Sequence, residues 1–280
     1  MLYVDRVPSP PLDAFIASIW YCQSEPRPFA FERVLPIGAA QLIVNLKEDR
    51  TRMYHPESGA MTACCGTVLS GVSTRYGIID TAEQECVAGV CFRPGGTAPF
   101  FPMPAHELCD AGVPLELVWD RGRAARLREQ VLAAVSPAAR LAALERAMAE
   151  ASRSYAFDPA VSFALDAFAC RPHAANIPAV ADRIGLSPKR LVERFKTAVG
   201  VPPKRYCRIL RFQRALQSAE RGRPVDWTRI AMDCGYFDQA HFIHDFRSFA
   251  GITPTGYDAA RTQFRNHVHF LQSDAAVEVR

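Results

Sequence analysis

Two stretches of the chain follow the same plan. Residues 180–200 read VADRIGLSPKRLVERFKTAVG, and residues 230–251 read IAMDCGYFDQAHFIHDFRSFAG. The copies are 50 positions apart at Gly185 and Gly235 and 51 positions apart from the following helix onward, so the second copy carries one extra residue in its turn. Self-similarity at a fixed offset predicts that one supersecondary unit occurs twice.

Each copy has the residues that a helix-turn-helix unit requires. A small residue, Ala181 in the first copy, lets two helices cross closely, and Gly185 supplies the positive φ that ends the first helix. Ser187 is a natural N-cap with Pro188 at the first helical position, and Asp238 is the corresponding cap in the second copy. Units of this kind dock onto DNA with their second helix in the major groove.

Apolar residues recur along each second helix and leave a polar face directed outward. In the first unit we expect DNA contacts from Ser187, Lys189, Arg190, Glu193 and Lys196, and in the second from Gln239, His241, His244 and Arg247. The two outward faces differ. We therefore expect the protein to read two different short sequences and not one palindrome.

A long basic helix is predicted between the units. It is opened by Pro202-Pro203, runs from Lys204 to about Arg221 and ends at Gly222. We expect Arg208 on this helix to meet a phosphate. If the helix sets the two units roughly 34 Å apart, both recognition helices can enter successive major grooves on one side of the duplex.

The second copy carries the most specific motif of the chain. It reads Ile230-Ala231-x-x-x-Gly235-Tyr236-x-Asp238-x-x-His241-Phe242-x-x-x-Phe246, followed by Gly251-x-Thr253-Pro254-x-x-Tyr257. This stretch resembles the C-terminal domain of the AraC/XylS family of transcriptional regulators. His244 departs from the family, which often has Arg there, and so does Pro188 after the turn serine. The resemblance implies a bacterial regulator whose partners are promoter DNA, RNA polymerase and a second copy in a homodimer, with no cofactor and no catalytic residues.

Charge is distributed unevenly along the chain. Residues 1–170 carry 15 Lys and Arg against 19 Asp and Glu, and residues 171–280 carry 18 against 10. The positive field is therefore concentrated where the helix-turn-helix units lie, as a phosphate-binding surface requires.

The first half has short β-rich runs separated by turns. Strands are predicted at Arg33 to Leu35, Gln41 to Leu46, Thr67 to Ser70, Tyr76 to Asp80 and Cys86 to Phe92. Two helices follow, about Pro114 to Val135 and Ala138 to Arg153. The predicted fold class is α+β: a cupin-like barrel or sandwich with two helices, then an all-α domain of two helix-turn-helix units joined by a linker helix.

A further resemblance concerns the first half. Trp20, Leu35-Pro36-x-Gly38 and Phe92-Arg93-Pro94-Gly95-Gly96 resemble the N-terminal domain of uncharacterised AraC-like regulators. Such a domain implies binding of a small-molecule effector, whose identity the sequence does not reveal. Arg93 is a weak candidate for effector binding, since the following glycines could present backbone N–H groups to an anion; a plain glycine-rich turn is the alternative. The expected divisions are 1–153 (effector and dimerisation domain), 154–175 (linker), 176–265 (DNA-binding domain) and 266–280 (tail).

Other function classes find little in the sequence. The N-terminus lacks a targeting segment, and no apolar run approaches the ~20 residues of a membrane span, so we expect a cytoplasmic protein. The nine cysteines lack zinc-site spacing, no metal site is expected, and no catalytic motif of a hydrolase or phosphate-binding enzyme occurs. The alternative is a DNA-alkylation or thiol/redox-responsive regulator that uses its cysteines, for which the adjacent Cys64-Cys65 pair is the starting point.

Overall fold

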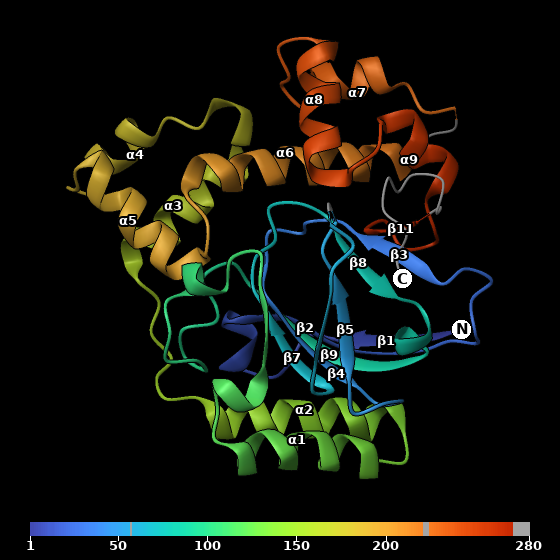
Figure 1. Ribbon diagram of the computed structural model, residues 1–280. Coiled ribbons are helices and arrows are strands. Elements are labelled where there is room, and N and C mark those ends of the chain that lie inside the picture. Colours follow the sequence, from blue (N-terminus) through green and yellow to red (C-terminus); the bar gives the residue numbers. More distant parts are fainter. Residues whose placement is uncertain (57, 221–223, 271–280) are drawn as a thin grey trace.

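The N-terminal region forms two antiparallel sheets that face each other (Figure 1). The computed structural model describes residues 1–56, 58–220 and 224–270. The six-stranded sheet has the order β1 (Leu2–Arg6), β2 (Ile16–Gln23), β9 (Cys86–Phe92), β4 (Gln41–Asn45), β7 (Thr67–Ser70), β10 (Gly112–Pro114). The five-stranded sheet has the order β11 (His267–His269), β3 (Phe31–Val34), β8 (Gly77–Asp80), β5 (Thr51–Tyr54), β6 (Met61–Cys64).

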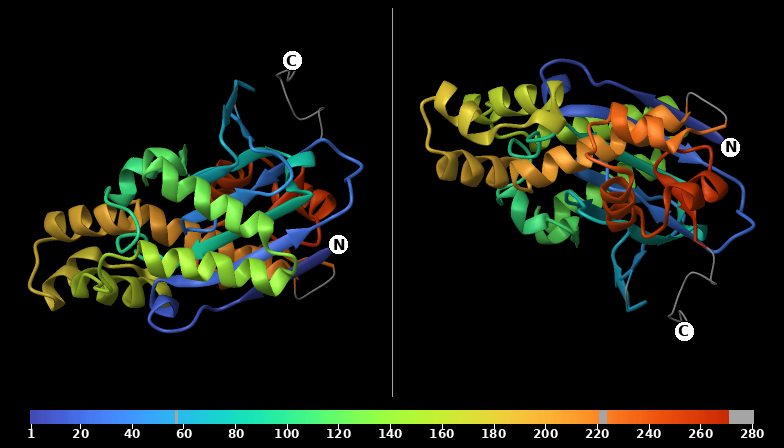
Figure 2. Two further views of the ribbon diagram at one scale, coloured as in Figure 1. Left: turned by 90° about the horizontal axis from the view of Figure 1, so that it is seen from below. Right: turned by 90° about the horizontal axis from the view of Figure 1, so that it is seen from above.

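Two helices cover the outer face of the six-stranded sheet. Helices α1 (Arg121–Ala133) and α2 (Pro137–Ala151) lie side by side below the sheet (Figure 1 and Figure 2, left). On β2, the alternate residues Ile19 and Tyr21 are buried in the core that this sheet shares with the helices. The period-2 alternation of a strand therefore sets one face of the sheet against the helices and turns the other toward the second sheet.

Part of the inner face of the six-stranded sheet is only half-buried. A Cβ on Gly112 would lie 2.6 Å from the sulfur of Met53 on β5, so Gly112 faces the second sheet. Cross-strand register places a row of small and polar side chains on the same face, namely Ser18, Cys91, Gln41 and Ser70. All four are half-buried, unlike the outer face, which is closed by the helices.

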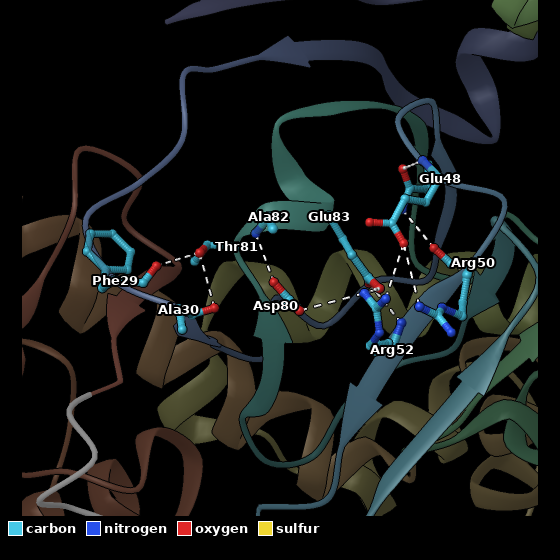
Figure 3. Close-up of polar contacts among 10 residues, drawn as sticks. Phe29, Ala30, Glu48, Arg50, Arg52, Asp80, Thr81, Ala82 and Glu83 are labelled. Atoms are coloured by element: carbon cyan, nitrogen blue, oxygen red, sulfur yellow. Dashed lines mark hydrogen bonds and ion pairs between the residues drawn. The ribbon is translucent and has the colours of Figure 1, made fainter. Parts of the chain in front are cut away.

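An ion cluster joins two strands of the five-stranded sheet (Figure 3). The Arg52 side chain on β5 lies 2.5 Å from Glu83, 3.2 Å from Glu48 and 3.7 Å from Asp80 at the end of β8. Glu83 is buried, and this burial raises its pKa, while Arg52 acts in the opposite direction. The cluster gives the buried carboxylate of Glu83 the paired cation that such a group needs.

The C-terminal region is all helical up to its last strand. It comprises α3 (Pro159–Cys170), α4 (Ile177–Arg183), α5 (Pro188–Val199), α6 (Pro203–Glu220), α7 (Trp227–Asp233), α8 (Gln239–Ala250) and α9 (Pro254–Ala260). Helix α6 runs between the two units and extends above the sheets (Figure 1). The predicted end of this helix at Arg221 and Gly222 lies outside the described residues.

The α+β class is confirmed: a β-rich N-terminal region with two helices precedes the helical domain. The five strands predicted in the first half all occur, with bounds shifted by up to two residues. Six further strands of the described residues were not predicted, namely β1, β2, β5, β6, β10 and β11.

Two of the expected divisions contain elements that the sequence did not predict. Residues 154–175, the expected linker, contain α3, whose Val161, Ala164 and Phe168 are buried in the core shared with the helix-turn-helix units. The expected tail, 266–280, begins with β11, which pairs with β3 of the N-terminal sheet. Val268 is fully buried there, and this burial stabilises a strand that a terminal position alone would not favour.

Candidate nucleic-acid interface

The first helix-turn-helix unit consists of α4 and α5. Gly185 has φ +67° and turns the chain between them, and Ser187 caps α5 by accepting a hydrogen bond from the backbone N–H of Arg190 at 3.3 Å. Leu191 and Phe195 are fully buried, which fixes the rotation of α5 about its axis. The opposite face is exposed and carries the expected residues Ser187, Lys189, Arg190, Glu193 and Lys196.

The second unit, α7 and α8, repeats this geometry. Gly235 has φ +73°, and the Asp238 carboxylate caps α8 by accepting from the backbone N–H of His241 at 2.7 Å. Of the expected contacts, Gln239, His244 and Arg247 are exposed. His241 differs: it is half-buried, and its ring centroid lies 5.3 Å from that of Tyr236.

Arg208 does not extend toward solvent as a phosphate contact would. Its guanidinium pairs with the carboxylate of Asp245 on α8, with Nη2 at 2.5 Å from Oδ1. Asp245 is buried, and Arg211 lies 3.7 Å away on its other side. The expected phosphate contact stays a prediction. The sequence does not show that Asp245 faces inward, where its charge requires a cation from α6.

Sequence reasoning missed one conspicuous residue, Phe237. Its side chain is 92% exposed and stands directly before the cap of α8. The N-caps Ser187 and Asp238 are 51 positions apart, whereas Leu186 and Tyr236 are 50 apart, so Phe237 is the extra residue of the second turn. The offset between the copies was the signal that could have singled it out.

Arg93 lies in a turn between the domains. Its Nε donates to the carbonyl oxygen of Asp13 at 2.8 Å, and the N–H of Gly96 donates to the carbonyl of Arg93 itself. The cavity that Arg93 helps to line has a volume of about 10 Å3. That is about the space of a single water molecule, too small for an organic effector.

Two family models match parts of the chain. One, described as a helix-turn-helix domain, matches residues 180–260, which hold both units and the helix between them. This C-terminal domain matches that of an AraC/XylS-family regulator. The other model, described as a domain of unknown function (DUF6597), matches residues 5–114, nearly all of the two sheets.

Solved structures of bacterial regulators are similar to this chain. A transcriptional regulator with an AraC-type DNA-binding domain from Chromobacterium violaceum is 26% identical, over 38% of this chain and 94% of that chain, with a TM-score of 0.34. A DNA-binding transcriptional dual regulator from Escherichia coli K-12 is 25% identical, over 36% of this chain and 97% of that chain, with a TM-score of 0.31. ToxT from Vibrio cholerae is 9% identical, over 85% of this chain and 96% of that chain, with a TM-score of 0.48. No curated protein was found to match the sequence.

The described part of the chain also bears on three other kinds of site. Its helices do not reach the length and hydropathy needed to cross a membrane. Within residues 1–56, 58–220 and 224–270, no three His, Cys, Asp or Glu side chains gather as metal ligands would. Burial raises the pKa of Cys64 to about 11, and the neighbouring Cys65 adds to the shift. A thiol with so high a pKa stays protonated near neutral pH, which argues against Cys64 as a reactive sensor.

Proposed function

We propose that this regulator binds promoter DNA through α5 and α8, which read two different half-elements, and that a small molecule held by the N-terminal domain controls this binding. The observation that carries the proposal is the pair of capped, solvent-exposed helices α5 and α8, joined through the single continuous helix α6. A continuous helix fixes the spacing of the two units, and spacing by about one duplex turn, roughly 34 Å, allows both to enter the major groove.

The contacts on α5 and α8 divide into two groups. Lys189, Arg190, Glu193 and Lys196 belong to the half-element of α5, and Gln239, His244 and Arg247 to that of α8. Ser187 and His241 act mainly through the helix that they hold in place: Ser187 caps α5, and His241 packs on Tyr236.

The effector is proposed to bind between the two sheets. Support comes from the inner row of Ser18, Cys91, Gln41 and Ser70, which is half-buried where a closed core would be fully buried. These side chains offer neutral hydrogen-bonding groups. An uncharged polar ligand, or the polar end of a larger one, fits that chemistry.

The other partners follow from the same arrangement. Exposed apolar side chains lie at the end of α1 and in the turn after it, where Leu132 is 37% and Val135 98% exposed, and we propose that α1 and α2 pair with a second copy. RNA polymerase is the proposed further partner at the promoter, and a protein that acts there works in the bacterial cytoplasm. This function is performed by binding and not by catalysis.

Salt dependence tests the DNA-binding part. The full chain should shift a pool of random duplexes in a gel at ~50 mM salt, and the logarithm of its affinity should fall with the logarithm of salt concentration by about 0.9 per phosphate contact. A flat response to salt, or no shift at low salt, would contradict DNA binding.

Point variants test the sensing part without removing a domain. Gln41→Ala should abolish the response of a promoter reporter to growth conditions that induce it, while DNA affinity stays unchanged. Gln23→Ala, at the exposed end of β2, is the matched control and should respond normally. If Gln41→Ala responds like the control, the space between the sheets is not the sensor.

A further inference from the structure

The outward face of α8 combines apolar and polar side chains, whereas that of α5 is charged. Ala240 and Ile243 line an open hollow of about 580 Å3 on α8, together with His244, Arg247 and Ser248. The exposed Phe237 stands at the N-terminal end of the same helix. In α5 the exposed face carries Lys189, Arg190, Glu193 and Lys196.

Phe237 has no evident structural role in the second unit. A hydrophobic residue directly before an N-cap often packs on the fourth residue of the helix, here Phe242, and so fixes the entry of the chain. In this unit Tyr236 performs that packing, since its ring centroid lies 5.0 Å from that of Phe242 and it is itself buried. With 92% of its surface exposed, Phe237 contributes little to the core.

The position of Phe237 is where a recognition helix approaches base edges. The N-terminal residues of such a helix make the base contacts in the major groove. Among the groups displayed there, the 5-methyl of thymine is the apolar one, and Phe and Ala side chains contact it. Arg247 and His244, farther along the hollow, supply polar groups beside this apolar end.

We infer that Phe237, with Ala240, reads thymine 5-methyl groups in the half-element of α8. This inference rests on the proposed function, because it requires that α8 enters the major groove. By this inference, Phe237 is the specificity-determining residue that the one-residue insertion adds to the second unit. The half-element bound by α8 should then be rich in thymine.

The test removes the methyl group without changing base pairing. The full-length protein first selects a duplex from a random pool, and the change in the selected sequence caused by Gln239→Ala identifies the half-element of α8. The thymidines of that half-element are then replaced by deoxyuridine, and the Kd of each duplex is measured by fluorescence anisotropy. The wild-type protein should bind the deoxyuridine duplex about fourfold more weakly for each methyl that Phe237 contacts.

The variants decide whether Phe237 is responsible. Phe237→Ala should lose the part of this discrimination that Phe237 supplies, and Phe237→Leu, which keeps an apolar contact, should retain most of it. Met232→Ala is the matched control, because Met232 is also an exposed apolar side chain, 65% exposed on α7; it should discriminate like the wild type. Since Phe237 is exposed, all three variants should melt at the wild-type temperature.

Failure of this inference is distinguishable from failure of the proposed function. If no duplex is selected at all, the protein does not bind DNA as proposed. The role of Phe237 is refuted if a duplex is selected but its α8 half-element lacks thymine. It is also refuted if replacing thymidine by deoxyuridine weakens the binding of Phe237→Ala by the same factor as that of the wild type. It is also refuted if Phe237→Ala changes the molar mass in light scattering and leaves DNA discrimination intact, because Phe237 would then serve self-association.

Discussion

The two helix-turn-helix units share their internal residues and differ in their outward ones. Gly185 and Gly235 both have positive φ, and Phe195 and Phe246 are both fully buried at equivalent positions. The exposed face is charged on α5, whereas that of α8 combines apolar and polar side chains. Folding constrains the inside of the unit, and the outside is free to specify different base sequences.

The same comparison shows one interaction with its charges exchanged. Arg194 on α5 pairs with Asp158 before α3 at 2.8 Å, and Asp245, at the equivalent position on α8, pairs with Arg208 on α6. Each pair attaches the recognition helix to the helix that precedes its unit. The first pair is solvent-accessible and the second is centred on a carboxylate that is 3% exposed. The two pairs therefore should differ greatly in their contribution to stability.

Arg208→Ala should produce the largest effect. It leaves the buried Asp245 with only the more distant Arg211, and uncompensated burial of a charge costs about 3–5 kcal/mol of unfolding free energy. Arg194→Ala, its counterpart in the first unit, should cost at most about 1 kcal/mol, as exposed pairs do. Urea unfolding of both variants measures this. If the two variants lose the same unfolding free energy, the two ion pairs do not differ in burial.

The turn glycines give the next largest contrast. A Cβ on Gly235 would lie 2.4 Å from the Cβ of His173, whereas a Cβ on Gly185 would meet no atom within 4 Å. Gly185→Ala should cost only the strain of positive φ, about 1–2 kcal/mol, and Gly235→Ala should cost about 1–3 kcal/mol more through overpacking. Thermal melts of the two variants side by side test this. If Gly185→Ala lowers the melting temperature more than Gly235→Ala does, the packing described around the second turn is wrong.

The sequence predicted the interior of each unit better than its surroundings. Glycines, caps and apolar periodicity are local signals, and they placed the turns and the buried faces of α5 and α8. The partner of Arg208 and the burial of Asp245 depend on how α6 meets α8, which local patterns do not encode. Strand β11 was missed because its stability comes from pairing with β3, more than 200 positions earlier. Phe237 was missed because DNA contacts were predicted only from polar and charged residues, although the shift in offset between the copies marks its position.

Alanine variants of the outward residues sharpen the comparison on the DNA side. Lys189→Ala or Glu193→Ala should relax selectivity in one half-element, and Gln239→Ala or His244→Ala in the other, each by about 1–3 kcal/mol where a base is contacted. Competition binding against single-base variants of the selected duplex measures the loss. If variants on α5 and on α8 relax selectivity at the same base positions, the two helices do not read different half-elements.

The units also differ in how they are attached to the sheets. The pH dependence of thermal stability should show a small part of this difference. Beyond the second unit, β11 is held to β3 partly by His267, which lies 2.9 Å from the buried Glu32. Burial would raise the pKa of Glu32, but His267 and Arg27 more than offset this and hold it below its usual 4.5. Because the folded pKa is lowered, the stabilisation is fully present above pH 4.5 and is lost as the pH falls below it. Glu32→Gln should flatten the pH dependence of melting in that range; an unchanged profile would show that Glu32 does not contribute.

Selection of binding sites by the full-length protein tests the central claim most directly. A random duplex library enriched at moderate salt should yield two dissimilar half-elements about one duplex turn apart, and the Lys189→Ala and Gln239→Ala proteins should each alter only one of them. A single symmetric palindrome, with both variants changing the same bases, would contradict the claim that the two units read different sequences.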